Sequence, residues 1–145
     1  MERQDSDYLR ELLRQLVRKL GILEKSDTNC YGVTISQCHA IVEIGRAGEI
    51  SLNELAKLLT LDKSTMSRTV NNLVEKMIVI RESHPKDRRY VTIKLTDKGI
   101  AAFKNIEESM GKYYEDIFMS IPENKRDQVL DSLKLLTDAV NQNNK

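Results

Sequence analysis

The sequence has little of several features that mark particular classes of protein. It carries two cysteines, Cys30 and Cys38, which are too few for a disulfide framework in a chain of 145 residues. No apolar run approaches the roughly 20 residues of a membrane-spanning helix, and the first ten residues are too polar for a signal peptide. We therefore expect reduced thiols, a cytoplasmic location and no membrane partner.

Sequence patterns that mark common enzymes are missing as well. There is no glycine-rich phosphate loop, no GxSxG, no HExxH and no convincing pair of acids. The two histidines, His39 and His84, fall on separate predicted elements, and the spacing of Cys30 and Cys38 is not that of a zinc knuckle. We expect a chain that is not an enzyme and that has no catalytic residue, metal site or cofactor.

The charge of the chain is nearly balanced but unevenly distributed. A net charge of +1 would by itself argue against a nucleic-acid partner. Residues 63–98, however, hold nine lysines and arginines against four acids, whereas residues 1–62 and 99–145 are each slightly acidic. A local basic surface attracts phosphate groups whatever the total charge is. Alternatively, the basic region is only a solvated hairpin. This alternative loses weight if a helix with DNA-binding side chains lies next to it in the sequence.

The basic region is preceded by signals for two short helices joined by a tight turn. Ser51 and Glu54 have the spacing of a capping box, which predicts where the first helix begins. Thr60 and Leu61 predict the turn. Asp62 is a suitable N-cap for the second helix, because its charge favours the positive end of the helix dipole.

The second helix has one apolar and one polar side. Its apolar stripe is predicted from five residues at helical spacing, namely Met66, Val70, Leu73, Val74 and Met77. The polar side holds groups that hydrogen-bond base edges and phosphates in a major groove. We predict five DNA contacts there, Ser64, Thr65, Ser67, Arg68 and Asn71. The three hydroxyl groups are expected to contact phosphates or pyrimidine methyls. Arg68 and Asn71 are expected to contact purine edges.

A hairpin is predicted after the second helix. Its two β-rich runs cover residues 78–82 and 90–95. The loop between them reads SHPKDRR, which gathers five charged or ionisable side chains in seven residues. Arginine suits a narrow minor groove, where the potential is most negative. We predict Arg89 as a minor-groove contact and Asp87 as its orienting partner. Two further residues are predicted as phosphate contacts, Lys86 and Arg88.

The preceding segment predicts another helix with its own cap. Thr34 opens this helix, and Gln37 completes a capping box three residues later. Gly45 and Gly48 are expected to end the helix. The short run Glu49–Ile50 then predicts a small strand that joins the sheet of the hairpin.

The sequence from Leu55 to Gly99 resembles the MarR (multiple antibiotic resistance regulator) family of winged-helix transcription factors. The resemblance is carried by DKSTMSRTVNNLVEK, by DRR in the loop and by LTDKG after the hairpin. It implies one mainly α chain with a small β-wing, in which a winged helix-turn-helix over residues 34–98 is flanked by dimerisation helices within residues 1–33 and 99–145. Met77 departs from the pattern, since the family usually has a glycine there.

Amphipathic helices are predicted at both ends of the chain. They cover residues 8–24, residues 97 to about 120 behind the cap Thr96, and a last helix that begins at Pro122. Pairing of these helices between two copies would bury their apolar stripes and place two reading helices about 34–36 Å apart. The resemblance likewise implies a homodimer on a near-palindromic operator. Packing of these helices within one monomer is the alternative.

The resemblance also implies a pocket for an effector, often a small aromatic or phenolic acid. Four residues are candidates for its lining, although each also fits ordinary core or surface: Tyr31, His39, Met110 and Tyr114. Cys38 falls on an apolar stripe, where a free cysteine behaves as a small hydrophobic group. Cys30 lies in a polar linker, which leaves oxidant sensing open at that residue.

The sequence thus predicts a sequence-specific regulator of transcription that binds double-stranded DNA. The resemblance favours a homodimeric repressor that a small-molecule or oxidative signal releases from its operator. The alternative is a winged-helix protein-interaction module without a specific DNA target. A protein-binding surface would not need a charge of +5 over residues 63–98.

Overall fold

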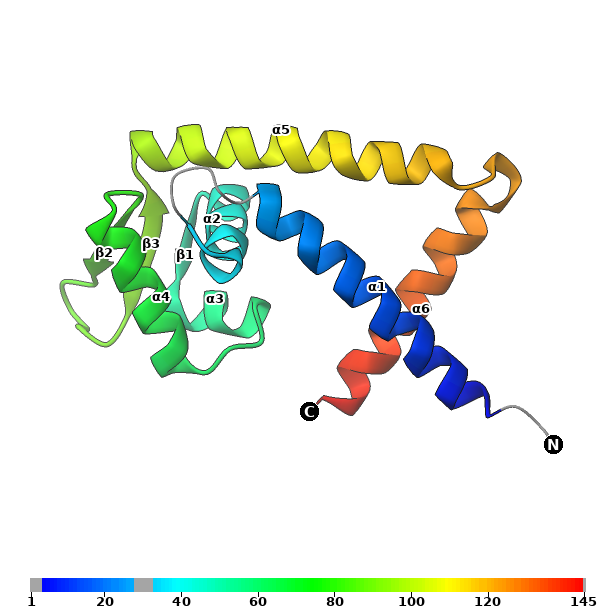
Figure 1. Cartoon of the computed structure of the whole chain (residues 1–145). Helices are drawn as coiled ribbons and strands as arrows, with labels where there is room; N and C mark the ends of the chain where they lie inside the picture. Colours follow the sequence, from blue (N-terminus) through cyan, green and yellow to red (C-terminus); the bar gives the residue numbers. More distant parts are fainter. Residues whose placement is uncertain (1–3, 28–32, 145) are drawn as a thin grey trace. The chain divides into compact units, whose positions relative to one another are not determined.

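The computed structural model describes residues 4–27 and 33–144, with the backbone alone for residues 21–27. Its elements are, in chain order, α1 (Asp5–Asp27), α2 (Ile35–Ala47), β1 (Glu49–Ser51), α3 (Leu52–Leu58), α4 (Lys63–Glu75), β2 (Val79–Ser83), β3 (Val91–Leu95), α5 (Asp97–Ser120), the 3-10 turn η2 (Glu123–Lys125) and α6 (Arg126–Asn143). This mainly helical chain with a small three-stranded sheet confirms the predicted fold class (Figure 1). Among the described helices, none has both the length and the apolarity that crossing a membrane requires.

The chain divides into two compact units, residues 1–108 and residues 109–145. The first unit contains the three-stranded antiparallel sheet, in the order β1-β3-β2. The short strand predicted at Glu49–Ile50 is present as β1, where Ile50 pairs with Ile93 of β3. Helix α4 packs against β2, and α2 packs against α4 and β3 (Figure 1). This packing places the second helix of the helix-turn-helix next to the hairpin.

The core of the first unit comes from α2, α3, α4 and the sheet. Eight large side chains are fully buried, Ile41, Ile44, Leu55, Met66, Val70, Leu73, Ile78 and Ile93. Burial of each such side chain contributes about 1.5–3 kcal/mol. The predicted apolar stripe of α4 is therefore confirmed for Met66, Val70 and Leu73. It stops there, because Val74 is 38% exposed and Met77 is 71% exposed.

The helix-turn-helix forms through local hydrogen bonds that the sequence largely indicates. The Ser51 hydroxyl accepts from the backbone N–H of Glu54 at 3.1 Å, as in a capping box, but it then donates to the Glu54 carboxylate at 3.1 Å. After α3, Thr60 adopts a positive φ of 55°. The N–H of Thr60 donates to Lys57 and that of Leu61 donates to Ala56. These two bonds are those of a Schellman motif, which ends α3 at the predicted turn.

The same motif ends α4, and it corrects the interpretation of Met77. The N–H of Met77 donates to the Val74 carbonyl and that of Ile78 donates to the Leu73 carbonyl, both at 2.9 Å. Met77 has a φ of 63°, in the left-handed region that glycine adopts most easily. It was predicted to extend the apolar stripe, and this prediction is wrong. The chain reverses at Met77, so its side chain points to solvent.

The Thr96 hydroxyl forms hydrogen bonds with both the end of α4 and the start of α5. Its hydroxyl accepts from the Gly99 N–H at 3.0 Å, which confirms Thr96 as the cap of α5. The same hydroxyl lies 2.6 Å from the Met77 carbonyl oxygen and 3.1 Å from that of Ile78. A Cβ atom on Gly99 would lie 2.1 Å from the Ile78 carbonyl oxygen. Only glycine allows the two segments to approach this closely.

Helix α2 has the predicted start but not the predicted end. Thr34 and Gln37 form the complete capping box, with bonds of 3.1 and 3.2 Å. Gly45 was predicted to help end the helix, but it lies inside α2, which continues to Ala47 and is capped by Gly48. A Cβ atom on Gly45 would meet the Phe103 ring at 2.4 Å. Gly45 is therefore a packing position and not a stop signal.

The terminal helices are longer or later than predicted, and their apolar side chains are largely exposed. Helix α1 exposes Leu12, Leu16 and three further large apolar residues, and it runs to Asp27, whereas it was predicted to end at residue 24, before the polar linker that contains Cys30. Pro122 was predicted to begin the last helix, but it caps η2, and α6 begins at Arg126. The remainder of that predicted linker, residues 28–32, lies outside the described residues.

The second unit is held by Arg126 at the turn between α5 and α6. Its guanidinium donates to the carbonyls of Ile121 and Met119 at 3.0 and 3.1 Å, and it lies 5.4 Å from the centre of the Phe118 ring. The side chain thereby satisfies carbonyl groups at the end of α5.

Candidate nucleic-acid interface

The polar side of α4 forms a single exposed stripe. Ser64, Ser67, Arg68 and Asn71 follow the i, i+3, i+4, i+7 spacing, which places them on one face of the helix. Ser64, Arg68 and Asn71 are exposed, and Ser67 is half-buried. The opposite face is anchored by Met66, Val70 and Leu73 in the core, so the direction of the polar stripe is fixed.

The first turn of α4 is organised around Asp62. Asp62 occupies the predicted N-cap position, but its carboxylate makes no capping hydrogen bond of ordinary geometry. It accepts instead from the Ser64 hydroxyl at 2.6 Å. The hydroxyl of Ser64, followed by that of Thr65, lowers the pKa of Asp62 from its ordinary value. In the free protein the single donor of the Ser64 hydroxyl is therefore directed at Asp62.

The next turn contains a second internal contact. The Arg68 guanidinium donates to the Thr65 hydroxyl at 3.4 Å, and Thr65 is half-buried. The Thr65 carbonyl accepts from the buried Thr69 hydroxyl at 3.0 Å. Thr65 therefore contacts one terminal nitrogen of the Arg68 guanidinium.

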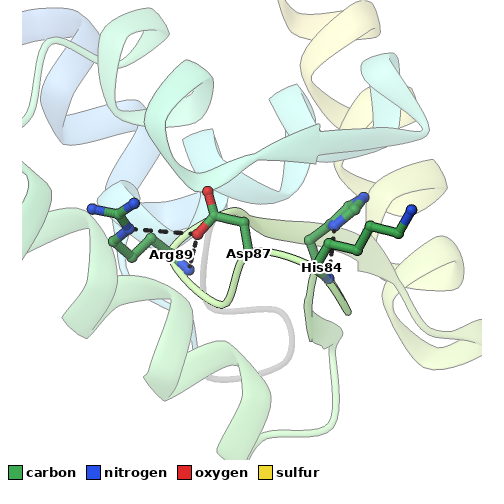
Figure 2. Close-up of polar contacts among 4 residues, drawn as sticks. His84, Asp87 and Arg89 are labelled. Carbon is green, nitrogen blue, oxygen red and sulfur yellow. Dashed lines mark hydrogen bonds and ion pairs between the residues drawn. The ribbon is translucent and has the colours of Figure 1, made fainter.

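The tip of the hairpin is a compact turn built on His84 and Asp87. The Asp87 carboxylate accepts from the backbone N–H of Arg89 at 3.0 Å and lies 3.5 Å from its Nε (Figure 2). The His84 Nδ1 accepts from the Lys86 N–H at 3.2 Å, and the His84 ring meets the Tyr90 ring edge-on. The predicted pairing of Asp87 with Arg89 is confirmed.

The Arg89 side chain is 95% exposed even though it is paired. An exposed ion pair contributes little to folding stability. Its effect is to align the guanidinium, because Asp87 contacts Nε and leaves the two terminal nitrogens pointing away (Figure 2).

A groove lies between α4 and the hairpin. Its volume is about 470 Å³, and four cationic side chains line it, Lys63, Arg81, Arg88 and Arg89. Ser64 and Ser67 of α4 also line it, as do Ser51, Leu52, Asn53, Tyr90 and Val91. None of these lining residues, all within the described part of the chain, is acidic. Of the predicted DNA contacts, Ser64, Ser67, Arg88 and Arg89 line this groove. The other five are not among the residues that line it, namely Thr65, Arg68, Asn71, Lys86 and Asp87.

Arg81 and Lys63 are groove residues that the sequence interpretation missed. Arg81 lies on β2, two residues after the buried Val79. Because strand residues two apart share a face, Arg81 points toward the same side of the sheet as Val79, where α4 lies. Its Nη1 donates to the Oδ1 of Asn71 on α4. The alternation of β2 could have indicated this direction, but not the partner.

Within the described part of the chain, the candidates for oxidant sensing and for an effector pocket are not among the residues that line this groove. Cys38 is buried, as expected for a structural thiol. His39 and Tyr114 are exposed and Met110 is half-buried. Cys30 and Tyr31 lie outside the described residues.

Comparisons with known proteins agree with this fold. The sequence profile of the MarR family matches residues 31–89. The curated protein YdgJ of Bacillus subtilis (strain 168), an uncharacterized HTH-type transcriptional regulator, is 23% identical over 131 residues, covering 90% of this chain and 80% of that protein. The transcriptional repressor MdtR of the same organism is 27% identical over 75 residues, covering 52% of this chain and 48% of that protein. Over the matched residues the chain is therefore similar to the MarR family.

A similar fold is also found among solved structures. The crystal structure of Streptococcus pneumoniae FabT in complex with DNA matches with a TM-score of 0.85 and 21% identity, covering 94% of this chain and 98% of that one. At this identity the likeness establishes the fold alone. The fold and the names of the curated relatives agree with a transcriptional regulator of the winged helix-turn-helix type.

Proposed function

We propose that this chain binds double-stranded DNA sequence-specifically as a homodimer. It represses transcription from a near-palindromic operator until a small-molecule or oxidative signal releases it. The observation that carries the proposal is the groove in which Ser64 and Ser67 of α4 meet four cations and no acid among its described lining residues. Such a DNA-binding protein works in the compartment that holds the DNA, which we take to be the cytoplasm.

In the proposed complex α4 enters the major groove and the hairpin tip reaches the adjacent minor groove. Arg68 and Asn71 contact base edges, while Ser64, Thr65 and Ser67 contact phosphates or the methyls of pyrimidines. Arg89, held by Asp87, enters the minor groove, and Lys86 and Arg88 contact phosphates. The direction of the α4 stripe and the alignment of Arg89 support these assignments.

The homodimer is supported by the exposed apolar side chains of the terminal helices. On α6, Leu130 and Leu133 are half exposed, as are Leu12 and Leu16 on α1. Apolar surface of this extent is costly to leave in water. A two-fold dimer would cover it and would set the spacing of two α4 helices, which gives a simple route to release: a signal that changes this spacing prevents both helices from docking at once.

The signal is proposed to be a small aromatic compound or an oxidant. Cys30 is the candidate for oxidation, because Cys38 is buried. Peroxide should weaken DNA binding of the wild type and leave Cys30→Ser unaffected if the oxidative signal acts there. Equal DNA affinity with and without peroxide in both proteins would leave small-molecule release as the only proposed signal.

The function can be tested by selection of duplexes from a random DNA pool. The proposal predicts that an inverted repeat emerges, with half-sites about 10–10.5 base pairs apart from centre to centre or a multiple of that spacing. Sedimentation should show two chains per selected duplex. A pool that stays random after repeated selection would contradict sequence-specific binding and favour the protein-interaction alternative.

A further inference from the structure

We infer that Arg81 is a specificity-determining residue, which acts by holding the side chain of Asn71 so that this amide offers only donors to DNA. The inference rests on the proposed function and concerns one base pair in each half-site. Its starting point is the hydrogen bond from Arg81 Nη1 to Asn71 Oδ1, which links the hairpin to the reading helix.

The orientation of the Asn71 amide follows from the chemistry of its partner. Arginine carries donors only, so the atom of Asn71 that faces Arg81 must be the carbonyl oxygen. The amide nitrogen, with its two N–H groups, is then the part of the Asn71 amide that remains for a ligand. In this pose Asn71 resembles a short lysine or arginine more than a free asparagine.

This pose changes which base the residue prefers. A free asparagine pairs with adenine by accepting from N6 and donating to N7. With Arg81 at Oδ1, an adenine amino group would bring its N–H beside the guanidinium donors, which repel it. Guanine presents two acceptors, N7 and O6, to the major groove, and these match the two N–H groups of Asn71. Asn71 is therefore expected to select guanine.

The position of Arg81 is fixed by the sheet. It lies opposite Ile93 of the central strand β3, and Ile93 is fully buried. Both side chains of the Arg81–Asn71 pair are exposed in the free protein, where such a bond is weak. Docking on DNA removes water from the groove, and a charge-assisted bond becomes stronger in that environment.

The chain offers a matched control on the same sheet. Lys94 is adjacent to Ile93 on β3, so its side chain points to the opposite face, where it lies 3.6 Å from Glu82. Replacement of Lys94 by methionine removes one positive charge from the hairpin without touching Asn71. Arg81→Met removes one charge and the hydrogen bond.

The test is selection from a random DNA pool, performed with the wild type and with Arg81→Met, Asn71→Ala and Lys94→Met. The wild type should favour guanine at one base pair of each half-site by about fivefold or more. Arg81→Met should shift that same base pair toward adenine. Asn71→Ala should abolish the preference there, and Lys94→Met should retain guanine.

The outcomes separate the inference from the proposed function. If the wild type enriches no motif, both fail. If the wild type and Arg81→Met enrich the same motif, the inference alone is overturned, and Arg81 is then a phosphate contact. The inference is also overturned if Arg81→Met loses the guanine preference without gaining one for adenine, while Asn71→Ala retains the guanine preference. In that case Arg81 itself would contact the base. Thermal unfolding of each variant confirms that the selected proteins are folded.

Discussion

The winged-helix head, residues 34–98, and the terminal helices α1 and α6 differ in how they bury apolar side chains. In the head, Leu55 and Leu73 are fully buried within a single chain. Leu12 on α1 and Leu133 on α6 are each 45% exposed. The head therefore buries these side chains within one chain, whereas the terminal helices leave theirs exposed. In the proposed dimer this difference would separate the binding of DNA from the pairing of chains.

The largest effect is expected in the core of the head. Leu73→Ala removes a fully buried side chain that also belongs to the Schellman contact with Ile78, and it should cost about 2–5 kcal/mol in the free energy of unfolding. Val74→Ala, at the next and partly exposed position, should cost less than about 1 kcal/mol. Denaturant unfolding measures both. Equal losses would mean that the head is not packed as described.

The next effect concerns the terminal helices. Leu133 lies on the α6 stripe with Val129, Leu136 and Val140, so Leu133→Glu should raise the dimer dissociation constant by about 100-fold or more. Leu135 is 70% exposed and off the stripe, which makes Leu135→Glu the matched control. Sedimentation equilibrium measures the dissociation constant. The predicted role of the terminal helices in dimerisation would be contradicted by a wild type that is monomeric at micromolar concentration. Equal effects of the two variants would contradict it as well.

The hairpin tip provides a prediction within the head. Arg89→Ala should lower the affinity for the selected operator by about tenfold or more, because the aligned guanidinium is lost from the minor groove. Lys86→Ala should mainly reduce the dependence of affinity on salt, with a slope smaller by about 1. Fluorescence anisotropy in a salt series measures both. Unchanged affinity in Arg89→Ala would exclude this residue from the interface.

The smallest effect is a gain in stability at Met77. A non-glycine residue in the left-handed region is strained, so Met77→Gly should stabilise the head by about 0.5–1 kcal/mol without changing DNA affinity. Gly48, which has a φ of 80°, is the converse control, and Gly48→Ala should destabilise by a similar amount. Destabilisation by Met77→Gly would indicate that the side chain, and not the reversal of the chain, matters there.

Local signals explain why much of the head could be predicted from the sequence. The caps at Thr34 and Thr96 depend on residues three positions apart, and the α4 stripe depends on helical spacing. The same rules fail at Met77. This apolar residue follows the α4 stripe at helical spacing, so the pattern predicts that the helix continues past it. The Schellman motif that ends α4 there is joined by a bond from the Thr96 hydroxyl, 19 residues away, which no local pattern contains.

The candidate site likewise combines a contact between near neighbours, which the sequence predicts, with a contact between distant elements, which it does not. The pairing of Asp87 with Arg89 is a contact between near neighbours, and it could be predicted. The bond between Arg81 and Asn71 joins a strand to a helix across ten residues, so the side-chain types alone gave no reason to pair them. The capping signal at Asp62 does not indicate the Asp62–Ser64 bond, because it assigns the carboxylate to a backbone N–H of α4.

The central claim is that α4 and the hairpin form one surface that reads DNA sequence. Its most direct test is the affinity of the wild type for the selected operator and for a scrambled duplex of equal length, measured by anisotropy at several salt concentrations. The account predicts a preference for the operator of about 10³-fold or more, and an affinity that falls steeply as salt is added. Equal affinity for both duplexes at every salt concentration would contradict it.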